Sequence, residues 1–87
     1  MAQTARGMHK SVHSPEQLAF RQLLINARKK ADLTQQQLSK KLRRPQSFVA
    51  KYEGGERRLD VIEFLGICRA IGADPMRILH ALLRNLS

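Results

Sequence analysis

The chain has 87 residues, which is enough for one small domain and too few for a second hydrophobic core. Apolar residues make up 43% and charged residues 26%, which excludes an intrinsically disordered chain. The single cysteine excludes an intramolecular disulfide framework and a cysteine-based zinc cluster. No apolar stretch is long enough to span a membrane, and the N-terminal residues lack an apolar secretion signal. We therefore expect a cytoplasmic protein.

Positive charge is concentrated in the middle of the chain. The sequence holds 16 Lys and Arg against 7 Asp and Glu, a net charge of +9. Residues 28–58 carry ten of these cations and three of the acids, while residues 59–87 are neutral overall. Such a basic face attracts a polyanion, because neutralised phosphates release condensed counterions. The alternative is a charged surface that only keeps the protein soluble.

The chain begins with a segment that shows no periodic apolar pattern, and we expect residues 1–14 to be a flexible basic arm. A basic arm can enter a DNA groove, although such segments are more often simply disordered. Ser14-Pro15 predicts the start of a first helix, because a capping hydroxyl precedes a proline at the first helical position. The apolar face of this helix follows at helical spacing and comprises Phe20, Leu24, Ala27 and Ala31.

Two short helices joined by a tight turn are predicted over about residues 34–53, the layout of a helix-turn-helix. Thr34 and Gln37 have the spacing of a capping box, so the first of the two helices begins there. Leu38 and Leu42 form its buried face. Pro45 suits the first turn of the second helix, and Gly54-Gly55 ends it.

The second short helix, residues 45–53, has a core face and a polar face. Val49 and Tyr52 are expected to face the core, and we expect Phe48 to project into solvent. The polar face comprises Gln46, Ser47, Ala50 and Lys51. An amide can bond the edge of adenine, an ammonium can donate to guanine, and a hydroxyl can bond a base or a phosphate. The alternative is an ordinary solvated helix face.

Two further helices complete an all-α fold of five helices. Asp60 is a suitable N-cap for the fourth, Gly72 ends it, and its apolar residues are Val61, Phe64, Leu65, Cys68 and Ile71. We expect Cys68 to be a packing residue. Asp74-Pro75 starts the fifth helix, whose apolar stripe is broader than a small core needs. We predict a dimer interface there, formed by Ile78, Leu79, Leu82, Leu83 and Leu86.

Three strings carry a family resemblance: ARKKADLTQQQLSKKL, RRPQSFVAKYEGGERRLDVIEF and LGICRAIGADP. The run from Arg28 to about Leu79 resembles the xenobiotic-response-element helix-turn-helix family, which includes the phage lambda and 434 repressors and Cro. The resemblance covers about 50 of the 87 residues. It implies a lambda-repressor-like DNA-binding domain over residues 15–87.

The resemblance also implies roles for individual residues. Those that would read base edges are Gln46, Ser47 and Lys51. Those that would contact the DNA backbone are Gln35, Arg57 and Arg58, with Gln35 also bracing the recognition helix. We expect Arg43 and Arg44, in the turn before that helix, to add further backbone contacts through their charge. Arg28 and Glu53 would form a structural ion pair. Two positions depart from the family: Arg43 stands where Gly is usual, so a positive φ would strain it, and Ala50 replaces a common Ser.

We interpret the chain as a sequence-specific DNA-binding transcription regulator, a repressor that binds double-stranded DNA as a homodimer on a palindromic operator. An antitoxin that also binds a partner protein, a protein-interaction adaptor, and unspecific RNA or polyanion binding are the alternatives. No catalytic constellation is present, so we do not expect an enzyme. His9, His13 and His80 lack companions at ligand spacing, so we expect no metal site and no cofactor.

Overall fold

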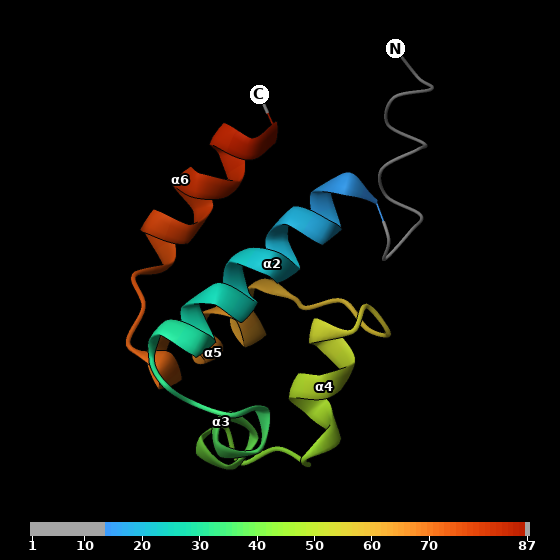
Figure 1. Ribbon diagram of the computed structural model, residues 1–87, viewed down its shortest axis with the longest axis vertical. Coiled ribbons are helices and arrows are strands. Elements are labelled where there is room, and N and C mark those ends of the chain that lie inside the picture. Colours follow the sequence, from blue (N-terminus) through green and yellow to red (C-terminus); the bar gives the residue numbers. More distant parts are fainter. Residues whose placement is uncertain (1–13, 87) are drawn as a thin grey trace.

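The computed structural model describes residues 14–86, which form five α-helices and no strand (Figure 1). The all-α prediction is confirmed. The helices are α2 (Pro15–Lys30), α3 (Gln35–Lys41), α4 (Ser47–Glu53), α5 (Val61–Ile71) and α6 (Pro75–Leu86). The basic arm predicted for residues 1–14 lies outside the described residues, apart from Ser14.

Side-chain caps mark the starts of α2, α3 and α5. The Ser14 hydroxyl accepts a hydrogen bond from the Gln17 backbone N–H at 3.1 Å, and Thr34 forms a reciprocal capping box with Gln37. Asp60 forms a second capping box with Glu63 at the start of α5. These contacts satisfy N–H groups that have no partner inside a first helical turn.

The second short helix begins later than predicted. Pro45 lies before α4, and Gln46 is the N-cap, with φ −54° and ψ −33°. The backbone N–H of Phe48 bonds to the Pro45 carbonyl at 2.9 Å, so the chain makes one tight turn before α4 starts.

Helix α2 runs through the middle of the molecule, and α6 lies beside it in the opposite direction (Figure 1). The short helices α3 and α4 lie together at the end of the molecule away from the C-terminus. The core between the helices comprises Leu24, Leu38, Phe48, Val49, Tyr52, Phe64, Ile67, Cys68, Ile71 and Ile78. The helix-turn-helix is therefore held at one end of a small, shared core.

Helix α5 packs through a narrower stripe than predicted. Phe64 and Cys68 are buried as expected, and the rings of Phe20 and Phe64 meet with centroids 5.4 Å apart. Burial raises the pKa of the Cys68 thiol to about 11, as suits a packing residue. Val61 and Leu65, however, are exposed, and Ile67 takes the core position instead. One helix face is only about 100° wide, so Phe64, Ile67, Cys68 and Ile71 already fill it.

Candidate nucleic-acid interface

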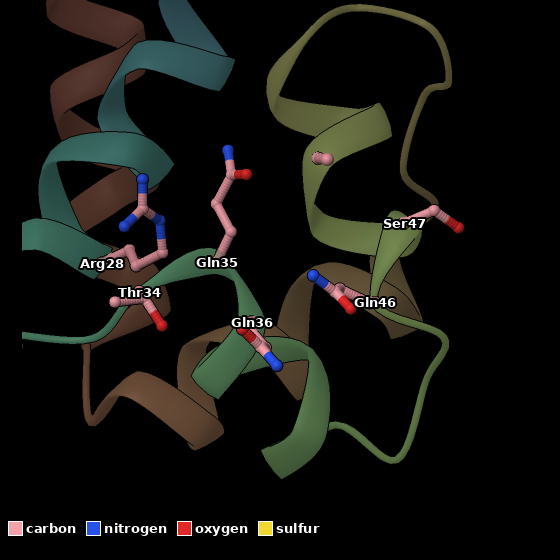
Figure 2. Close-up of a pocket in the computed structure, with 7 residues that line it drawn as sticks. Arg28, Thr34, Gln35, Gln36, Gln46 and Ser47 are labelled. Atoms are coloured by element: carbon pink, nitrogen blue, oxygen red, sulfur yellow. The ribbon is translucent and has the colours of Figure 1, made fainter.

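An open cleft separates the N-terminal turns of α3 and α4. Its volume is about 660 Å³, and its lining comprises Arg28, Thr34, Gln35, Gln36, Gln46, Ser47 and Ala50. Figure 2 shows Gln35 and Gln36 from α3 and Gln46 from the start of α4 around this one space. The cleft is thus bordered mainly by side chains that both donate and accept hydrogen bonds.

A buried ion pair links the end of α2 to the end of α4. Arg28 at the end of α2 donates two hydrogen bonds to Glu53 at the end of α4, with N–O distances of 2.8 and 3.1 Å. The side chains of the pair are only 10% and 4% exposed. Arg28 also donates to the Leu33 carbonyl at 2.7 Å, and the bond to Glu53 raises the pKa of the guanidinium. Arg28 therefore ties α2, the following loop and α4 together.

Gln35 completes this network from α3. Its Nε2 donates to Oε1 of Glu53 at 2.8 Å, so the first residue of α3 is linked to the last residue of α4. At the other end of α4, the hydroxyl of Ser39 donates to the Gln46 carbonyl at 3.2 Å. Helix α4 is thus attached to α3 at both of its ends.

Two side chains anchor α4 in the core. Val49 is fully buried and Tyr52 is 1% exposed, as the sequence predicts. The Tyr52 hydroxyl is buried and has no hydrogen-bond partner among residues 14–86. Its burial raises the pKa of the phenol, since the phenolate would lose its solvation.

The three residues expected to read bases lie on the outer face of α4. Gln46, Ser47 and Lys51 are all exposed, with Gln46 and Ser47 at the cleft and Lys51 one turn further along the helix. Ala50, between them, is also exposed and lines the cleft. The outer face therefore combines an amide, a hydroxyl, a methyl and an ammonium group.

The expectation that Phe48 projects into solvent is wrong. Phe48 is 7% exposed, and its ring meets the ring of Tyr52 with centroids 5.5 Å apart. The guanidinium carbons of Arg44 and Arg57 lie 4.2 and 5.0 Å from the centre of the Phe48 ring. The spacing of four residues between Phe48 and Tyr52 is the signal that would have placed both rings on one face.

Sequence reasoning also missed Glu63 and Gln36. Glu63 pairs with both Arg44 and Arg57, two residues expected to contact the DNA backbone. Gln36 lines the cleft opposite the start of α4. The capping spacing between Asp60 and Glu63 identifies a helix start but gives no sign of the arginines that meet there.

Arg43 has a positive φ of 56°, in the left-handed region that favours glycine. Its side chain is exposed in the turn between α3 and α4. Arg58 is exposed in the loop that leads from α4 to α5. These two cations therefore lie on the surface, one in the chain segment before α4 and one in the segment after it.

The α6 residues predicted to form a dimer interface differ in burial and fall into two groups. Ile78 is 8% exposed and belongs to the core of the chain itself, because α6 packs against α2 and α5 through it. Leu79, Leu83 and Leu86 are exposed and Leu82 is half-buried. The prediction is therefore wrong for Ile78, which has little surface left for a partner.

None of the helices in residues 14–86 has the length and apolar character to cross a membrane. Within the same residues, no three His, Cys, Asp or Glu side chains lie close enough together to share a metal ion. His9 and His13 lie outside the described part of the chain.

Comparison with known proteins agrees with this geometry. The helix-turn-helix domain family matches residues 19–81. The XRE-family like protein from Pseudomonas syringae pv. tomato str. DC3000 has a similar solved structure, with 49% sequence identity and a TM-score of 0.77. The similarity covers 84% of this chain and 91% of that one. No curated protein matches the chain. The chain belongs to the XRE-type helix-turn-helix family and is a DNA-binding transcription regulator.

Proposed function

We propose that this regulator is a repressor that binds, as a homodimer, to a two-fold symmetric DNA operator. The observation that carries the proposal is the open cleft between α3 and α4, with the exposed outer face of α4 beside it. A helix of seven residues is about 10 Å long and fits a major groove about 12 Å wide.

Base reading in this proposal comes from Gln46, Ser47 and Lys51. The Gln46 amide can form two hydrogen bonds to adenine, and the Lys51 ammonium can donate to guanine. The Ala50 methyl group lies between them and can contact the methyl group of thymine. The close hold of Glu53 on Arg28 and Gln35 supports this role, because base recognition needs a helix that does not shift.

Backbone contacts in this proposal come from side chains around α4. Gln35 uses one amide hydrogen on Glu53 and keeps the second for a phosphate oxygen. Arg43, Arg44, Arg57 and Arg58 supply the positive charge. Such contacts set the register of the protein on the duplex and make the affinity dependent on salt.

A homodimer is supported by the exposed leucines of α6. Leu79, Leu83 and Leu86 form one exposed apolar strip that a second copy would cover in an isologous contact. The two recognition helices would then read half-sites about 34 Å apart. Occupation of such an operator blocks transcription by itself, so repression needs no catalytic group. Because the protein must reach its DNA operator, we also propose that it is cytoplasmic.

Binding of a second protein, such as a toxin, is the other candidate. It is favoured by Val61 and Ile62 at the start of α5, which are 69% and 75% exposed although both are aliphatic. A chain that serves only as an adaptor should keep its protein partner when Gln46 and Lys51 are both replaced by Ala. A DNA reader should lose its operator in the same variant.

Selection of binding sites from random duplex DNA at two salt concentrations tests the proposal, with Gln46→Ala beside the wild type. We expect an enriched two-fold symmetric motif that becomes less defined in the variant, at a cost of about 1–3 kcal/mol for the lost base contact. Binding without any motif, lost entirely at the higher salt, would reduce the protein to an unspecific polyanion binder. A monomer in sedimentation at tens of micromolar would contradict the dimer.

A further inference from the structure

Four side chains form a cluster that joins the turn before α4, α4 itself, the following loop and the start of α5. Glu63 stands at its centre. Nη2 of Arg44 lies 2.8 Å from Oε2 of Glu63, and Arg57 forms a fork on the same carboxylate, with both N–O distances 3.0 Å. The fourth member is Phe48, whose ring lies beneath both guanidinium groups.

This cluster holds the two arginines without burying them. The side chains of Arg44 and Arg57 are still 41% and 39% exposed, while that of Glu63 is 19% exposed. Each guanidinium has five N–H donors; within residues 14–86 Arg44 donates one hydrogen bond to Glu63, and Arg57 donates two, to Glu63 and to the Arg58 carbonyl. Both groups therefore keep donors for an outside acceptor.

We propose that Glu63 and Phe48 are positioning residues that hold Arg44 and Arg57 as a preformed clamp for the phosphates of bound DNA. This inference rests on the proposed function. A planar guanidinium matches phosphate oxygens with two parallel hydrogen bonds, but only in one orientation. A flexible arginine loses side-chain entropy when it adopts that orientation, and the cluster removes much of this cost before the DNA arrives.

The sign of the Glu63 effect distinguishes positioning from simple electrostatics. A carboxylate close to DNA repels phosphates, so its removal should strengthen binding if charge alone matters. Hydrogen bonds from Arg57 and from the Asp60 backbone N–H lower the pKa of Glu63, which keeps it charged at neutral pH. If Glu63 positions the arginines, its removal should weaken binding although the protein becomes more positive.

The decisive comparison is Glu63→Gln against Glu56→Gln. A glutamine at position 63 still closes the capping box with Asp60, so the start of α5 is retained while the ion pairs are lost. Glu56 lies exposed in the same loop and is not one of the partners of Arg44 or Arg57 in this cluster. Both variants therefore gain the same charge in the same region, but only one of them releases the arginines.

The measurement is binding to a labelled mixed-sequence duplex over a salt series, with thermal unfolding recorded for each variant. We expect Glu63→Gln to bind about tenfold more weakly than the wild type at low salt, since two side chains must then be ordered on binding. Its dependence on salt should fall by about one phosphate contact. Glu56→Gln should bind as tightly as the wild type or more tightly.

A second variant keeps the proposal falsifiable if Glu63→Gln unfolds. Arg57→Lys retains the charge but cannot form the fork, and we expect about threefold weaker binding. Equal or tighter binding by Glu63→Gln, or by Arg57→Lys where the first variant is unfolded, would overturn the clamp and leave the proposed function in place. A wild type that binds no duplex at any salt would overturn both.

Discussion

Different kinds of contact stabilise the two ends of this molecule. Helices α3 and α4 have seven residues each and, besides their buried core residues, are held by directed polar contacts from Arg28, Gln35 and Ser39 to the ends of α4. Helices α2, α5 and α6 have 16, 11 and 12 residues and meet mainly through apolar side chains such as Phe20 and Phe64. The end proposed to meet DNA is therefore the more polar one.

The short helices α3 and α4 need these polar contacts because of their length. An isolated helix of seven residues is unstable in water, because its first turn costs more entropy than its few hydrogen bonds return. Apolar packing alone holds a helix at a broad range of rotations, whereas a fork between two charged groups has one geometry. The proposed reading of bases by α4 needs one orientation of this helix, and the polar network supplies it.

The largest effect on stability is expected from a substitution of Glu53, which accepts hydrogen bonds from both Arg28 and Gln35. Glu53→Gln leaves the Arg28 guanidinium buried without a countercharge, and we expect a loss of about 3–5 kcal/mol in the free energy of unfolding. Urea denaturation measures it. Because Gln35 also depends on Glu53, the folded fraction should bind its operator more weakly as well.

The double variant Arg28→Met with Glu53→Leu is the control for that result. It removes both charges and replaces them with apolar groups of similar length, so it should be more stable than either single change. If the losses of the single variants simply add in the double variant, Arg28 and Glu53 do not act as a pair.

A comparable loss of stability without a loss of DNA recognition is expected at the apolar end. Ile67→Ala removes a side chain that is almost completely buried in α5 and leaves a cavity, at a cost of about 2–5 kcal/mol. Below the melting temperature, operator affinity per folded molecule should stay at the wild-type value. A specific loss of operator affinity would show that the two ends are coupled more tightly than this comparison states.

The smallest effect is expected at Arg43, where one substitution should raise stability and weaken DNA binding. Arg43→Gly relieves a left-handed backbone conformation in the turn between α3 and α4, and we expect about 0.5–1 kcal/mol of added stability. The same change removes a cation and should weaken binding to any duplex. A variant that is less stable than the wild type would mean that the Arg43 side chain holds the turn in place.

Local signals predicted most of the fold. Ser14, Thr34, Asp60 and Gly72 marked helix ends correctly, because caps depend on residues only a few positions apart. The core positions Leu24, Leu38, Val49 and Tyr52 also followed from helical spacing. The family resemblance implied the ion pair of Arg28 and Glu53. These residues are 25 positions apart in sequence, so helical spacing alone does not reveal their contact.

What could not be predicted depends on contacts between distant segments. Phe48 is buried because Arg57, from the loop beyond α4, lies over its ring, and Ile78 is buried because α6 turns that side toward α2. Val61 is exposed although it is aliphatic, since other residues already fill the inner face of α5. Hydrophobicity gives the tendency to be buried, and only the packing of the whole chain decides which residue is covered.

The buried ring of Tyr52 gives this protein an optical label at a useful place. The sequence contains one tyrosine and no tryptophan, so the intrinsic ultraviolet emission of the chain comes mainly from this phenol on α4. Its raised pKa keeps the ring un-ionised in alkali for as long as α4 stays seated in the core. The absorbance change of phenolate formation would therefore record the detachment of α4, with no dye and no substitution.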